Sequence, residues 1–117
     1  MPFRFEELNI WHRAMELNDQ IFTLTKSFPK EEIYVLTSQI RRASDSIVLN
    51  IAEGSTGQTK TVFKLFLGYS LRSAIEVVGC LFIAKRRKYV DEERFQFLYS
   101  EYEVLVKMIT SMRNSLK

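Results

Sequence analysis

The sequence predicts an all-α protein, an up-down-up-down antiparallel four-helix bundle that forms one domain over residues 1–117. Three observations predict it. Apolar residues recur at helical spacing in four separate segments, and the breaks between these segments are short. The composition is 46% hydrophobic and 26% charged, with only four Gly and two Pro. A chain of 117 residues can bury one core of this kind without a disulfide or a metal.

The first two helices are expected on either side of a proline. Residues 5–28 form the first segment, whose apolar positions alternate in steps of four and three: Ile10, Ala14, Leu17, Ile21, Leu24 and Phe28. Pro29 cannot continue that helix but suits the first turn of the next one. The second helix is therefore predicted from Pro29 to Gly54, with the apolar repeat Ile33, Leu36, Ile40, Ala43 and Ile47. Gly54 is expected to be a left-handed cap at its end.

The third and fourth helices follow a short polar loop and a second connection. Thr59 or Thr61 is expected to cap the third helix, from Val62 to about Lys85, which is apolar on most of its circumference. Asp91 is the expected N-cap of the fourth helix. That helix keeps a strict three-four alternation over three heptads, typical of a bundle seam: Phe95, Leu98, Tyr102, Leu105, Ile109, Met112 and Leu116.

Several classes of protein are not favoured. The single cysteine, Cys80, excludes an internal disulfide, and no apolar run at the N-terminus has the length of a signal peptide, so we expect a cytoplasmic protein. The longest uninterrupted apolar run, residues 77–84, is below the ~20 residues of a membrane span, so no membrane association is expected. His12 is the only histidine and lacks a metal-binding partner at helical spacing, and nucleotide-binding and nucleophile motifs are absent. We therefore expect no enzyme, no metal and no cofactor.

The positive charge is concentrated in one segment. Net charge is +3, yet residues 55–90 hold seven Lys and Arg against Glu76 alone. The candidate nucleic-acid-binding residues are a cluster at the end of the third helix and two lysines at its start, if these come close in space: Lys60, Lys64, Lys85, Arg86, Arg87 and Lys88. The alternative is a solvated cluster that complements the dipole at the helix C-terminus.

A polar stripe runs along the second helix at spacings of 3, 4, 4 and 3, opposite polar residues of the third helix. The residues of this predicted network are Gln39, Arg42, Ser46, Asn50, Glu53, Ser73 and Glu76. One hypothesis is a structural network that fixes helix register and includes an ion pair of Glu76 with Arg42 or Arg41. A second is a ligand or subunit contact near Asn50, Glu53 and Gly54. A third is a small-molecule or metal site lined by Gln39, Arg42, Asn50 and Glu76.

Self-association is expected from the third helix. A bundle needs one apolar stripe per helix, but Phe63, Phe66, Tyr69 and Phe82 cannot all face one core. Left uncovered, they would form a larger apolar patch than monomers usually expose. A closed homo-oligomeric ring is the usual way to cover such a surface.

The central motif resembles a known family. It runs from Phe28-Pro29 through Gln39-Ile40-Arg41-Arg42-Ala43 to Asn50-Ile51-Ala52-Glu53-Gly54, with Leu8-x-x-Trp11 upstream and Phe63, Phe66, Leu67, Ser70, Ser73 and Glu76 downstream. This pattern resembles the bacterial 23S ribosomal RNA intervening-sequence proteins. The sequence departs from the pattern at Leu71-Arg72, where members often carry small residues.

The resemblance implies a four-helix bundle that assembles into a ring, a homopentamer, without enzymatic activity. Family members look like the accessory variability determinant of diversity-generating retroelements, a basic pentamer that associates with nucleic acid and a reverse transcriptase. The leading hypothesis is therefore a ring-forming protein that binds RNA or DNA through a basic surface, without strong sequence preference. The alternative is a protein-binding scaffold or accessory subunit that has no affinity for nucleic acid.

Overall fold

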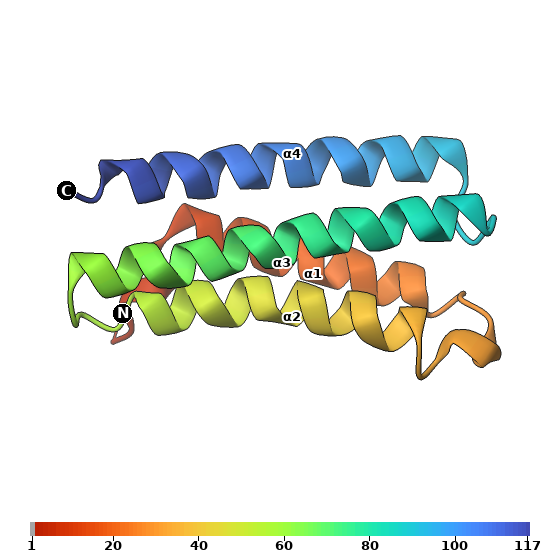
Figure 1. Cartoon of the computed structure of the whole chain (residues 1–117), viewed down its shortest axis with the longest axis horizontal. Coiled ribbons are helices and arrows are strands. Elements are labelled where there is room, and N and C mark those ends of the chain that lie inside the picture. Colours follow the sequence, from red (N-terminus) through yellow and green to blue (C-terminus); the bar gives the residue numbers. More distant parts are fainter. Residues whose placement is uncertain (1) are drawn as a thin grey trace.

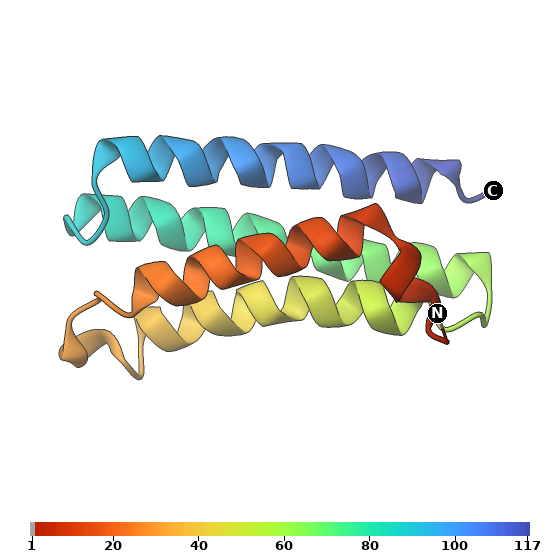
Figure 2. The ribbon, with the colours of Figure 1, turned by 180° about the vertical axis from the view of Figure 1, so that it is seen from behind.

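Four long helices make up most of the protein, which we describe over residues 2–117 from a computed structural model (Figure 1). They are α1 (Asn9–Thr25), α2 (Leu36–Gly54), α3 (Lys60–Arg86) and α4 (Glu92–Ser115), with short 3₁₀ helices η1 (Arg4–Glu7) and η2 (Lys30–Glu32). Successive long helices run in opposite directions, and the molecule measures 43 × 23 × 23 Å (Figures 1 and 2). Residues 2–117 contain no strand. The prediction of an all-helical protein with four long helices is confirmed.

The apolar repeats that predict the helices also form the core. All six positions of the first repeat are buried, and so are the first five of the fourth-helix heptads, from Phe95 to Ile109. Met112 and Leu116 lie at the C-terminal end of α4. They pack against the core but stay partly exposed. In the second repeat Ile33 is exposed, whereas the positions from Leu36 onward are buried. The core therefore follows the sequence periodicity except at the start of the second segment and at the end of the fourth.

The predicted ends of the first and second helices are wrong in detail. The backbone is extended at Leu8, so η1 is separate from α1. Pro29 precedes η2, and α2 begins only at Leu36, seven residues later than predicted.

Gly54 is not a left-handed cap, because it is still part of α2; the positive φ of 88° belongs to Gly57 in the following loop. A Cβ atom on Gly54 would lie 2.7 Å from Cβ of Phe66 and 3.0 Å from Cδ1 of Phe63. A glycine is therefore needed at this position because α2 and α3 approach closely, and not because the backbone turns.

The predicted N-caps of α3 and α4 are confirmed. The Thr59 hydroxyl accepts a hydrogen bond from the Val62 amide at 3.0 Å, and the Asp91 carboxylate accepts one from the Arg94 amide at 2.7 Å. Each side chain satisfies one of the four free N–H groups at a helix start. Thr61 is the second residue of α3 and does not cap it.

Helix α3 is long and apolar enough to cross a membrane by length and composition, although its longest uninterrupted apolar run is short. In the structure it packs against both α2 and α4 (Figure 1). Only a third of its most apolar stretch is buried. Much of its apolar surface therefore faces away from the core.

Candidate functional sites

The shorter hydrogen bonds between the polar stripe of α2 and α3, over residues 2–117, lie in the central part of the stripe. The Ser73 hydroxyl donates to the Ser46 hydroxyl at 2.9 Å, and the Asn50 amide donates to the same oxygen at 2.9 Å. One turn away the Ser70 hydroxyl, fully buried, donates to the Ile47 carbonyl at 3.0 Å. These bonds join α2 to α3 over about one turn of each helix, where they oppose a change in helix register.

The expected ion pair of Glu76 is not formed. Glu76 is exposed, and among residues 2–117 its side chain accepts one long hydrogen bond, 3.4 Å, from the Gln39 amide. Arg41 turns toward α1, where it donates to the Thr25 hydroxyl at 2.7 Å and lies over the Phe22 ring. The physical reason is that an exposed carboxylate is solvated by water and needs no buried partner.

Arg42 and Glu53 are both exposed, and over residues 2–117 neither forms a side-chain hydrogen bond or an ion pair. Arg42 lies on the wall of a groove of about 570 Å³ between α2 and α3. The groove begins at Tyr34 and is lined by Tyr34, Val35, Ser38, Gln39, Arg42, Ala43, Ser46, Ser73 and Glu76. Asn50 does not line it. The residues of the predicted polar network are thus divided. Ser46 is hydrogen-bonded to both Asn50 and Ser73, whereas Arg42 is exposed to solvent on the wall of the groove.

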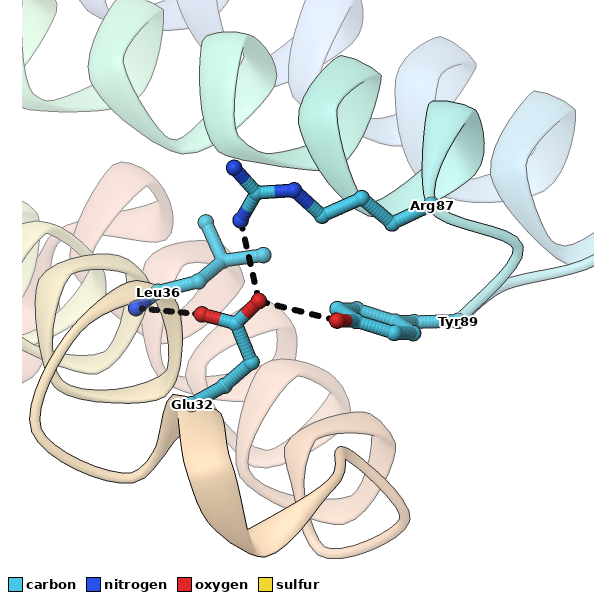
Figure 3. A network of polar contacts seen from close by, with 4 residues as sticks. All are labelled: Glu32, Leu36, Arg87 and Tyr89. Carbon is cyan, nitrogen blue, oxygen red and sulfur yellow. Dashed lines mark hydrogen bonds and ion pairs between the residues drawn. The ribbon is translucent and has the colours of Figure 1, made fainter.

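The basic cluster lies where α3 ends and the chain turns into α4, and two of its four cations are held by carboxylates. Arg87 donates to Glu32 Oε2 at 2.9 Å, and Tyr89 donates to the same oxygen at 2.9 Å (Figure 3). Glu32 Oε1 accepts from the Leu36 amide, at the first turn of α2, at 3.4 Å. Lys85 pairs with Glu92 at 2.9 Å.

The hydrogen bonds of Glu32 change the pKa of this carboxylate and of Tyr89. The Tyr89 hydrogen bond, with the Leu36 amide and the Arg87 guanidinium, lowers the pKa of Glu32. The same shared proton raises the pKa of Tyr89. Glu32 is therefore ionised at neutral pH and holds the η2 segment against the end of α3. Sequence reasoning missed this contact, because its partners are 55 and 57 residues apart along the chain.

The remaining candidate cations are not gathered into one patch. Arg86 and Lys88 are exposed and have no ion pair within residues 2–117. Lys60 and Lys64 are exposed at the other end of α3. At 1.5 Å per helical residue, the Cα atoms of Lys64 and Lys85 are roughly 30 Å apart. The condition that all six residues come close in space is therefore not met.

The outward face of α3 carries apolar side chains around a glycine. Ile75 is 65% exposed and Phe82 is 51% exposed, and Ile83 is also exposed. They lie one helical turn from Gly79. Within residues 2–117, an added Cβ at Gly79 would have no atom within 4 Å apart from its chain neighbours and the backbone of its own helix. We call Ile75, Gly79, Phe82 and Ile83 the α3 apolar face. Of the four aromatics expected to compete for the core, Tyr69 and Phe82 are exposed, whereas Phe63 is buried.

Neither a thiol nucleophile nor a metal centre is supported by these side chains. Burial, with a smaller effect of Glu76, raises the pKa of Cys80 to about 11, so its thiol is protonated at neutral pH. In residues 2–117 no three His, Cys, Asp or Glu side chains are grouped so that they could hold a metal ion.

Comparison with known families decides the relationship. The family model described as the 23S rRNA-intervening sequence protein matches residues 6–111. The chain belongs to this family. A solved structure from Bacteroides thetaiotaomicron VPI-5482, described as a protein with unknown function from the S23 ribosomal protein family, is similar with a TM-score of 0.83 and 24% identity. The match covers 90% of this intervening-sequence family chain and 95% of the other. A search of curated proteins found no match.

Proposed function

We propose that this member of the 23S rRNA-intervening sequence family is a non-enzymatic protein that assembles with copies of itself into a closed ring. The observation that supports this best is the α3 apolar face. Three large apolar side chains surround an exposed glycine on the helix that is most apolar in the chain. Solvent exposure of such a face is unfavourable by about 25 cal/mol per Å² of apolar surface.

A second copy of the chain is the partner we propose for the α3 apolar face. Gly79 lets another helix approach closely, and the neighbouring Ile75, Phe82 and Ile83 supply the apolar contact around it. Family membership adds the expectation of a pentamer stated above. A scaffold that binds a different protein, such as a reverse transcriptase, is the alternative use of the same face.

The test is the mass of the protein in solution, measured by sedimentation velocity over a dilution series. Ile75→Glu places a charge in the α3 apolar face and should shift the protein to monomers. Val104→Glu is the matched control, because Val104 is also an exposed aliphatic residue but lies on α4. Equal masses for the wild type and Ile75→Glu would contradict the proposal.

Nucleic-acid binding is a second candidate function, and Arg86 and Lys88 favour it. Both are solvent-exposed and unpaired within residues 2–117, so either can neutralise a phosphate, whereas Arg87 and Lys85 would first have to leave Glu32 and Glu92. The two free cations that each chain carries at the end of α3 give weak binding to a single subunit. Several copies in a ring would strengthen it through multivalency.

Charge reversal tests this second function. Arg86→Glu with Lys88→Glu should abolish binding of a mixed-sequence RNA at low salt. Lys60→Glu with Lys64→Glu changes the net charge equally at the other end of α3 and should weaken binding less. Equal effects would mean that binding responds to net charge alone. If the wild type binds no RNA at low salt, nucleic-acid binding is refuted and the protein-binding scaffold is the alternative that stays.

A further inference from the structure

We propose that Tyr34 and the groove beside it bind an unpaired nucleotide, with Tyr34 stacking on the base and Arg42 neutralising a phosphate. This inference rests on the nucleic-acid candidate above and deepens it, because it specifies single-stranded nucleic acid. It also assigns two residues outside the basic cluster to that function.

The first supporting observation is the exposure of the link between η2 and α2. Ile33 is 52% exposed, Tyr34 91% and Val35 59%. The residues on either side, Glu32 and Leu36, are buried. Three consecutive apolar side chains on the surface are unusual where the neighbouring residues are firmly packed.

The second observation is that this link is fixed in place. Glu32 is bound by Arg87, Tyr89 and the Leu36 amide, so the segment is anchored at both ends of the exposed run (Figure 3). A backbone that is already held in place loses little further conformational entropy when a ligand binds to it. The backbone that carries the exposed Tyr34 ring is therefore positioned before a base arrives.

The third observation is the chemistry of the groove that starts at Tyr34. Its volume of about 570 Å³ lies within the ~300–1,000 Å³ of small-ligand sites. Arg42 on its wall has no bonding partner within residues 2–117, and Ser38 and Gln39 offer hydrogen-bonding groups. Glu76 is the one carboxylate of the lining, and the Gln39 amide donates to it. An aromatic ring beside a free guanidinium and polar side chains is suited to a base and its phosphate.

The fourth observation is charge near the groove. The Glu32 to Arg87 contact places the η2 segment against the end of α3, where Arg86 and Lys88 are free. Lys30 is also exposed, beside Glu31. The segment that carries Tyr34 therefore begins next to the end of α3 that holds these free cations, which could neutralise phosphates of the same strand. Paired bases are already stacked on their neighbours, so a duplex cannot use Tyr34 in this way.

The experiment measures the affinity of the whole chain for a mixed-sequence single-stranded RNA and for the same RNA annealed to its complement. Stacking of one base on an aromatic side chain predicts that Tyr34→Ala weakens single-strand binding roughly 5- to 150-fold per occupied site. Tyr34→Phe should bind as the wild type does, and neither variant should change duplex binding. Arg42→Gln should reduce the salt dependence by about one phosphate contact.

Phe97→Ala is the matched control, because Phe97 is an exposed aromatic residue on α4 outside this groove. Its affinity for the single strand should equal that of the wild type. The inference is overturned if Tyr34→Ala leaves single-strand affinity unchanged, or if it weakens duplex binding equally. It is also overturned if Tyr34→Ala dissociates the assembly without affecting RNA binding, because Tyr34 would then contact a second copy.

These outcomes are separable from failure of the nucleic-acid function itself. If the wild type binds the single strand and the Arg86→Glu, Lys88→Glu variant does not, the basic cluster binds nucleic acid. An unchanged affinity of Tyr34→Ala for the single strand would then refute only the stacking site. If the wild type binds no RNA at low salt, both proposals fall together.

Discussion

Gly79→Ala should affect the single chain and the assembly in opposite directions. Gly79 is exposed within α3, and over residues 2–117 a Cβ atom there would have no atom within 4 Å apart from its chain neighbours and the backbone of its own helix. Alanine therefore adds helix propensity without a clash, and the free energy of unfolding of the monomer should rise by about 1 kcal/mol. If a second helix packs closely on Gly79, the added methyl group makes that contact too crowded and makes association less favourable by about 1–3 kcal/mol per interface. Association should then weaken roughly 5- to 150-fold per interface.

The assay pairs urea unfolding, at a concentration where the protein is monomeric, with sedimentation equilibrium over a dilution series. Gly68→Ala is the control, because the Arg113 side chain of α4 lies 3.4 Å from the position of its Cβ, so this glycine is less open than Gly79. It should stabilise the monomer to a similar or smaller extent and leave association unchanged. A Gly79→Ala protein with unchanged association would refute close packing at this face. A destabilised monomer would refute the open environment of Gly79.

Two further predictions concern the fold that supports the sites. Gly54→Ala should lower the free energy of unfolding by about 1–3 kcal/mol, because its Cβ would lie 2.7 Å from Cβ of Phe66; urea denaturation that shows stabilisation would contradict the close approach. The lowered pKa of Glu32 means that its ionised form stabilises the fold above the ordinary value of 4.5, and that this contribution is lost as the pH falls through the lowered pKa. Glu32→Gln should therefore reduce the acid sensitivity of unfolding relative to Glu31→Gln, and parallel pH profiles of the two variants would exclude this role of Glu32.

The sequence predicts the helices and most of the core because both follow from local periodicity. The heptads of α4 are buried from Phe95 to Ile109, and Thr59 and Asp91 cap their helices through bonds to residues three positions away. Each of these features depends on residues within a few turns of one another. Such patterns can be read along the chain without knowledge of the tertiary structure.

The segment between α1 and α2 could not be predicted in the same way. Pro29 is compatible with a helix start, but the Glu32 carboxylate binds the Leu36 amide and, from another part of the chain, Arg87 and Tyr89. This contact lies between the end of the 3₁₀ helix η2 and the first residue of α2. The bonds of Glu32 to Arg87 and Tyr89 form only when the end of α3 lies beside η2. No pattern of neighbouring residues in the sequence predicts that arrangement.

In the candidate sites too, local features could be predicted from the sequence, whereas features that depend on tertiary contacts could not. Adjacent cations from Lys85 to Lys88 suggest one phosphate-binding cluster, yet the side chains point to different partners, and Glu32 and Glu92 hold two of them. Ser46, in the polar stripe of α2, accepts a hydrogen bond from Ser73 of α3, and helical spacing determines which residues share that face. The groove beside Tyr34 depends on the irregular link before α2, so the sequence periodicity gave no sign of it.

The most direct test of the central claim is the native mass of the wild-type protein, measured by native mass spectrometry at near-physiological ionic strength. A closed ring predicts one dominant species whose mass is a fixed multiple of 13.8 kDa, and the resemblance predicts five copies. Predominant monomers over the micromolar range would contradict self-assembly through the α3 apolar face. An open-ended series of masses would contradict closure of the ring.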